Sequence, residues 1–173
     1  MSKDEFFAFM PLLIYGIAVS ELMIHWRDYL KSGRRYWPHL IFGILLLELA
    51  FSNFYFLYDV LDQLFVNYLN FLARLTPPLV FLLLVSVYTP EENVDVKTYF
   101  NDKMRTIFLL LSFFIFLNMI MEIGWNELTY IRASAIFMCL LVAWFNSKPI
   151  FWIFIAFRAL LFIFYQILPI LIK

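Results

Sequence analysis

Six long apolar segments constrain the fold of this chain more than any other feature of its sequence. Each is long enough to cross the roughly 30 Å hydrocarbon core of a bilayer as an α-helix. Inside lipid, a chain satisfies its backbone hydrogen bonds only in helices or closed barrels. The sequence therefore predicts an all-α fold, a polytopic membrane helix bundle that forms one transmembrane domain over residues 1–173. We expect six transmembrane helices, near residues 6–26, 39–58, 68–88, 106–124, 128–146 and 150–172.

Composition supports a lipid environment. Apolar residues make up 64% of the chain, against roughly 45–50% in an average soluble domain. A soluble protein of this composition would expose large apolar patches and aggregate. The formal net charge is zero, so no overall basic field points to nucleic acid. We therefore expect the lipid bilayer, and no nucleic acid, as a partner.

The basic residues predict how the bundle is oriented in the membrane. Eight of the thirteen Lys and Arg residues fall in segments 27–38, 89–105 and 147–149, whereas the opposite side carries only Lys3 and Lys173. The positive-inside rule places the three basic segments in the cytoplasm and both termini on the non-cytoplasmic side. All five tryptophans lie within a few residues of a predicted helix end, as an interfacial belt requires. These patterns predict a multi-pass protein of the cell membrane.

Two embedded charges of opposite sign are predicted to meet. Glu48 lies nine residues into segment 39–58, and Arg158 lies eight residues into segment 150–172. At about 1.5 Å per residue, both are roughly 12–14 Å from the cytoplasmic surface, near the midplane. A charge at that depth costs at least roughly 2.5–3.5 kcal/mol, so each needs a partner or a water-filled cavity. We predict that they pair, either as a structural lock between two helices or as a transport or gating pair in a permeation path.

A polar stripe continues from Glu48 toward the non-cytoplasmic surface. Its members are spaced 4, 3, 4 and 3 residues apart, which places them on one face of an α-helix. They are Glu48, Ser52, Tyr55, Asp59 and Asp62. Carboxylates and hydroxyls in such a row can solvate a cation or relay protons. A buried polar seam between helices would produce the same pattern.

Two further arginines, Arg74 and Arg132, are predicted in the outer half of the membrane. The acids at a comparable depth are Asp59, Asp62, Glu122 and Glu127. We interpret these groups mainly as structural ion pairs, because embedded charges need partners. In that interpretation Arg132 pairs with Glu122 or Glu127, and Arg74 pairs with Asp59 or Asp62. The alternative is an outward-facing cavity for an anionic ligand, lined by both arginines.

Both histidines of the chain are predicted near the cytoplasmic surface. Glu21 and His25 are four residues apart at the end of the first helix, and His39 opens the second helix. Two histidines at one level are candidate axial ligands for a haem, and with Glu21 they are candidate ligands for a metal ion. The alternative is interfacial anchoring, with Glu21 bonded to a neighbouring helix. Apart from this haem or metal hypothesis, we predict no cofactor.

Motifs that would indicate an enzyme do not occur in the sequence. There is no His-rich cluster, no Gly-x-Ser-x-Gly elbow and no P-loop, and each of these would supply a specific catalytic group. Cys139 is the only cysteine, which excludes an intrachain disulfide and a Cys-based zinc site. The sequence therefore favours a role other than catalysis.

The first hairpin resembles a known group of proteins. Ser20-Glu21 is followed by Trp26-Arg27, and then by Arg34-Arg35-Tyr36-Trp37-Pro38-His39-Leu40. This pattern is similar to the first hairpin of small uncharacterised bacterial multi-pass membrane proteins. In that group a first helix ends in Trp-Gly-Arg or Trp-Arg, a basic turn follows, and the next helix opens with an aromatic residue and His-Leu. The resemblance implies a bacterial inner-membrane setting and implies no activity.

The embedded charges lead to three functional hypotheses. The first is a small ion or proton channel or transporter-like subunit, with a polar path along the second helix. Such a protein would work as a homo-oligomer or as a subunit of a larger membrane complex. The second is a non-catalytic scaffold or effector that binds a soluble partner through segments 27–38 and 89–105, the latter being a surface helix or docking loop. The third is a haem or metal-binding membrane protein.

Overall fold

The computed structural model describes residues 3–29, 35–59, 68–91, 94–121 and 127–164, and this part of the chain is helical apart from short connections. In chain order the helices are α1 (Lys3–Tyr29), α2 (Trp37–Asp59), α3 (Tyr68–Tyr88), α4 (Val96–Met121), α5 (Glu127–Phe145) and α6 (Lys148–Phe162). The predicted all-α fold is confirmed.

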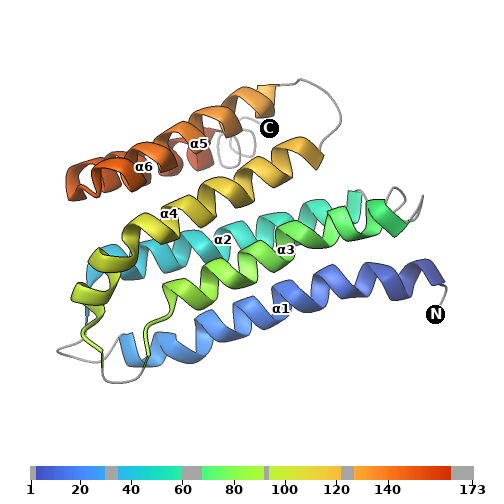
Figure 1. Ribbon diagram of the computed structural model, residues 1–173, viewed down its shortest axis with the longest axis horizontal. Coiled ribbons are helices and arrows are strands. Elements are labelled where there is room, and N and C mark those ends of the chain that lie inside the picture. Colours follow the sequence, from blue (N-terminus) through green and yellow to red (C-terminus); the bar gives the residue numbers. More distant parts are fainter. Residues whose placement is uncertain (1–2, 30–34, 60–67, 92–93, 122–126, 165–173) are drawn as a thin grey trace.

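The six helices run side by side, and each runs opposite to the helix before it in the chain (Figure 1). Helices α1, α3, α4 and α5 follow one another across the bundle, each packed against the next. Helix α2 packs against α1 and α4, and α6 packs against α5. Because consecutive helices alternate in direction, α2, α4 and α6 all run in the same direction. Residues at equal offsets along α2 and α6 can therefore lie at one level.

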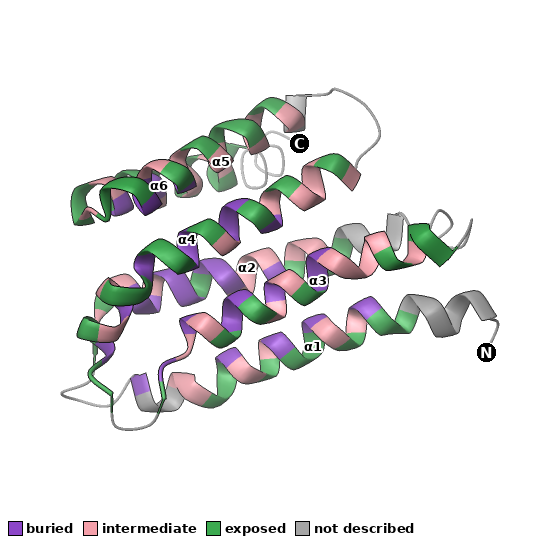
Figure 2. Ribbon diagram, viewed as in Figure 1, coloured by how far each residue is buried: buried purple, intermediate pink, exposed green. Residues whose placement is uncertain are grey.

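Within the described residues, four helices are long and apolar enough to cross a membrane. Their apolar stretches are Phe9–Trp26, Trp37–Tyr55, Tyr68–Tyr88 and Val96–Met121, and the apolar stretch of α5, Thr129–Phe145, is shorter. Exposed residues run along the outer faces of the bundle (Figure 2), and large hydrophobic side chains are among them on every helix. Lipid is the solvent that suits such a surface. These features are typical of a membrane protein and give four candidate spans, while crossing by all six helices stays a prediction.

The interior is built around the aromatic side chain of Phe42 on α2. Its ring centroid lies 5.2 Å from that of Phe108 and 6.0 Å from that of Phe100, both on α4. It also lies 5.9 Å from the ring of Tyr88 on α3 and 6.4 Å from that of Phe151 on α6. These separations are typical of favourable tilted aromatic pairs. One buried ring therefore connects α2 to three other helices.

The largest departure from the sequence-based bounds is at the start of α4. We expected this helix near residue 106, but it begins at Val96, so the segment expected to be a surface helix or docking loop forms its first turns. Asp95 caps the helix: its Oδ2 accepts hydrogen bonds from the Thr98 hydroxyl at 2.6 Å and the Thr98 backbone N–H at 3.0 Å. These bonds lower the pKa of the Asp95 carboxyl. Phe100 and Met104 are four residues apart on one face of the helix, and both are buried. Their packing attaches these turns to the bundle.

A tight turn sets α6 beside α5. Asn146 adopts a left-handed conformation with φ of 45°, which short polar side chains tolerate and which commonly ends a helix. Ser147 occupies the N-cap position of α6, and Pro149 lies in its first turn, where a missing backbone N–H is harmless. The turn therefore fixes the direction in which α6 leaves α5. Residues 165–172 of the predicted last span lie outside the described part of the chain.

Candidate functional site

An ion pair joins α2 to α6. Arg158 Nη2 donates a hydrogen bond to Glu48 Oε2 over 2.7 Å, so the contact predicted from depth alone is present. The side chains remain 28% exposed for Glu48 and 27% exposed for Arg158. The pair is therefore only partly covered by protein.

Aromatic packing sets the register of this pair. Phe42 lies six residues before Glu48, and Phe151 lies seven residues before Arg158. Because α2 and α6 run in the same direction, the contact between these two rings brings Glu48 and Arg158 to one level. Sequence reasoning found the two charges from their depth and missed the aromatic contact. Phe is too frequent in this chain for one Phe–Phe contact to be recognised in advance.

The rest of the predicted stripe on α2 is only partly described. Ser52 is half-buried one turn beyond Glu48, and Tyr55 is 71% exposed. Beside the stripe, the Asn53 amide donates to the Leu49 carbonyl at 2.8 Å. Asp59 belongs to the last turn of α2, but its side chain lies outside the described residues, as does Asp62. The described half of the stripe thus leads from the ion pair to the exposed side chain of Tyr55.

The predicted ion pairs of the outer half involve acidic side chains that lie outside the described part of the chain. Arg74 on α3 and Arg132 on α5 are half-buried, and neither is without a partner. Glu122 and the side chain of Glu127, predicted as partners of Arg132, lie outside the described part of the chain. Their pairing stays a prediction.

His39 is fully buried and packs against Tyr88 of α3. The two rings stack at 4.1 Å with an angle of 8° between their planes. The Tyr88 hydroxyl donates to the His39 carbonyl at 2.8 Å and lies 3.1 Å from His39 Nδ1. His39 Nε2 lies 3.3 Å from the Tyr88 carbonyl oxygen. Both ring nitrogens therefore have a neighbour on α3, and His39 joins the start of α2 to the end of α3.

The second histidine, His25, contacts a backbone carbonyl oxygen of its own helix, α1. His25 Nδ1 lies 3.0 Å from the carbonyl oxygen of Glu21. The ring of Tyr29 separates it from His39, at centroid distances of 6.3 Å to His25 and 4.6 Å to His39. Among the described residues, no three side chains of metal-ligating type gather at one point. The haem or metal hypothesis stays a prediction, in which His39 exchanges its contacts with Tyr88 for the ligand.

Gly43 is the position where α2 approaches the Tyr88 side chain. A methyl group there would lie 2.5 Å from Tyr88 Oη and 3.2 Å from Trp26 Nε1. Since Tyr88 is buried and hydrogen-bonded, we expect Gly43→Ala to destabilise the protein by about 1–3 kcal/mol, as overpacking does. Thermal unfolding in detergent measures this effect. Gly16→Ala is the matched control, because nothing lies within 4 Å of its added methyl, and it should leave the midpoint unchanged or raise it.

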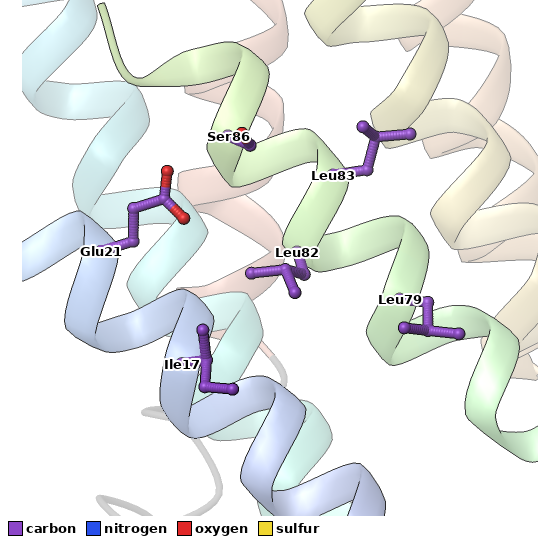
Figure 3. Close-up of a pocket in the computed structure, with 6 residues that line it drawn as sticks. All are labelled: Ile17, Glu21, Leu79, Leu82, Leu83 and Ser86. Atoms are coloured by element: carbon purple, nitrogen blue, oxygen red, sulfur yellow. The ribbon is translucent and has the colours of Figure 1, made fainter. Parts of the chain in front are cut away.

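A groove lies between α1 and α3 (Figure 3). Its volume is about 410 Å³, and its lining residues are Ile17, Glu21, Leu79, Leu82, Leu83 and Ser86. The Glu21 carboxylate points into the space between the two helices. It has no hydrogen bond or ion pair with any part of the chain that the structure describes, so the predicted bond to a neighbouring helix is not found there. Sequence reasoning singled out Glu21 but missed Ser86, which carried no signal without its neighbours. No family model, no curated protein and no solved structure matches this chain.

Proposed function

We propose that this chain is a small ion or proton channel or transporter-like membrane protein, gated by the Glu48–Arg158 pair. In this proposal all six helices cross the membrane and both termini lie on the non-cytoplasmic side. The observation that carries it is the position of the pair: it joins two helices at the predicted mid-membrane level, yet more than a quarter of each side chain is exposed.

Partial exposure at that depth has an energetic consequence. Facing lipid, a charge near the bilayer centre costs at least roughly 2.5–3.5 kcal/mol. The 2.7 Å contact between Arg158 and Glu48 gives each charged group one hydrogen-bond partner. The exposed part of each group still needs a polar environment. A water-filled path or the polar face of a second protomer provides one. The proposal therefore includes a homo-oligomer, or a larger complex, that encloses this edge of α2.

The polar stripe of α2 supplies a route to and from the pair. Ser52 and Tyr55 follow Glu48 along the helix, and Asp59 and Asp62 follow in the sequence. With the ion pair closed, Arg158 neutralises Glu48 and repels a second cation. With the pair open, the Glu48 carboxylate becomes free to bind a cation or a proton arriving along the stripe. Opening and closing one contact between α2 and α6 thus gates the path.

Flux measurements in proteoliposomes test this function. The variant to compare with the wild-type chain is the double substitution Glu48→Gln with Arg158→Met, which removes both charges and leaves neither group unpaired. We expect wild-type vesicles to dissipate an imposed proton or alkali-cation gradient faster than empty vesicles, and the double variant to lose at least about nine-tenths of that excess rate, as loss of a charged relay group implies. Glu91→Gln is the control, because Glu91 is an exposed loop carboxylate and its removal should leave the rate unchanged.

Two results would contradict the proposal. One is a double variant that folds and dissipates the gradient as fast as the wild-type chain. The other is a wild-type chain that dissipates neither gradient faster than empty vesicles.

The cytoplasmic end of α4 favours the scaffold function as a second candidate. Its first turns expose charges of both signs, including Lys97, Asp102 and Lys103, and exposed charge of both signs is typical of a polar docking surface. Capture of a soluble protein by the wild-type chain, lost when these three residues are replaced by alanine, would support this candidate. Retention of the captured protein by that variant would exclude it.

A further inference from the structure

The groove between α1 and α3 is amphiphilic along its length. Figure 3 shows Glu21 and Ser86 toward one end of the groove, with Ile17 and Leu79 farther along in the opposite direction. In the sequence, Glu21 and Ser86 are near the C-terminal ends of α1 and α3. Glu21 lies five residues before Trp26, which corresponds to roughly 7–8 Å along a helix. By the predicted orientation this is the cytoplasmic end. A polar head at that end and an apolar tail toward the membrane interior match the geometry of a lipid in the cytoplasmic leaflet.

The Glu21 carboxylate gives the groove a preference for cations. It is half-buried, leucine residues of α3 line the same groove, and no basic group of the described chain bonds to it. An anion in apolar surroundings gains most from a cation that also donates hydrogen bonds. The Ser86 hydroxyl, on the facing helix, is a further acceptor within the same groove. Among the residues that the structure describes, none therefore supplies this site with a positively charged donor.

We propose that this groove binds a phospholipid with a primary ammonium headgroup. The ammonium has three N–H donors, which match the carboxylate of Glu21 and the hydroxyl of Ser86. One acyl chain then lies along Ile17, Leu79 and Leu82. A quaternary ammonium carries the same charge and has no N–H donor, so charge alone does not satisfy the site. This inference goes beyond the proposed function and takes only the orientation of α1 and α3 from it, because headgroup binding does not require gating by the Glu48–Arg158 pair.

Native mass spectrometry of the full chain in detergent tests the inference. The probes are dioleoyl phosphatidylethanolamine, phosphatidylcholine and phosphatidylglycerol, added in equal amounts. We expect the wild-type chain to retain one phosphatidylethanolamine in preference to phosphatidylcholine by about tenfold, the effect of about one additional charge-assisted hydrogen bond. Phosphatidylglycerol should be retained least, because its charge repels Glu21. Glu21→Gln should reduce the preference to near one, whereas the control Glu91→Gln should keep it.

Two further variants separate headgroup recognition from folding. Ser86→Ala should lower the preference about twofold to fivefold, because it removes the weaker acceptor. Leu82→Trp fills the groove and should reduce the retention of all three lipids. Circular dichroism and gel filtration identify any variant that does not fold, and the remaining variants then decide.

Three outcomes would overturn the inference. The first is equal retention of phosphatidylethanolamine and phosphatidylcholine by the wild-type chain, which would make the groove an ordinary lipid-facing surface. The second is a folded Glu21→Gln variant with the wild-type preference. The third is displacement of the bound lipid by tetraphenylphosphonium with no recovery on adding more phosphatidylethanolamine, which would assign the groove to a hydrophobic cation.

Discussion

We expect Glu48→Gln to destabilise the folded bundle by about 2–3 kcal/mol, because it leaves the half-buried Arg158 guanidinium without its partner carboxylate. Arg158→Met should cost less, about 1 kcal/mol, although it breaks the same 2.7 Å contact. The asymmetry has a chemical reason: an unpaired carboxyl can become neutral by binding a proton, whereas a guanidinium stays charged at any accessible pH. Denaturation from mild detergent into sodium dodecyl sulfate measures both free energies.

The double substitution completes the cycle. We expect Glu48→Gln with Arg158→Met to be more stable than Glu48→Gln alone, since no charge is then left unpaired. The difference between the double variant and the sum of the single variants is the coupling energy of the pair. Additive free energies would show that the two side chains do not stabilise one another, and would remove the physical basis of the gate. A large coupling with unchanged flux would instead make the pair a structural lock between α2 and α6.

We expect Phe42→Ala to lower the free energy of unfolding by about 2–3 kcal/mol, an effect as large as that of Glu48→Gln. In soluble cores, Phe→Ala costs about 3–5 kcal/mol, a sum of lost hydrophobic transfer and the cavity left behind. In a membrane the unfolded helices remain in lipid, so most of the transfer contribution disappears and the packing loss remains. That loss is large here because Phe42 is fully buried and its ring contacts rings on α3, α4 and α6.

Phe54→Ala is the matched control for Phe42→Ala. Phe54 is on the same helix and is 50% exposed, so we expect a change within about 0.5 kcal/mol. The same denaturation measurement applies to both variants. Phe42→Ala should also weaken the Glu48–Arg158 coupling, since the Phe42–Phe151 contact holds α2 and α6 in register. Equal effects of the two Phe→Ala substitutions would show that the core does not depend on this ring.

The helical nature of the chain and most helix bounds followed from local properties. Residues 68–88 form α3 with the predicted ends, and the predicted 128–146 differs from α5 by one residue at each end. Helix length, apolar character and the requirement to satisfy backbone hydrogen bonds in lipid depend only on the sequence of one segment. They can therefore be predicted without knowing which helices pack against it. The start of α4 was missed because its first turns mix exposed charges with buried Phe100 and Met104, and burial depends on the rest of the bundle.

The candidate site divides in the same way. The depth of a residue along its helix follows from the sequence. Depth alone predicted the pairing of Glu48 with Arg158, because embedded charges of opposite sign at one level stabilise one another. The rotation of each helix and the identity of its neighbours are set by packing among all six. These alone place Phe42 against Phe151, the Tyr88 hydroxyl on His39, and Glu21 beside Ser86 in a groove. Such contacts depend on side chains tens of residues apart meeting in three dimensions, and no pattern within one segment encodes them.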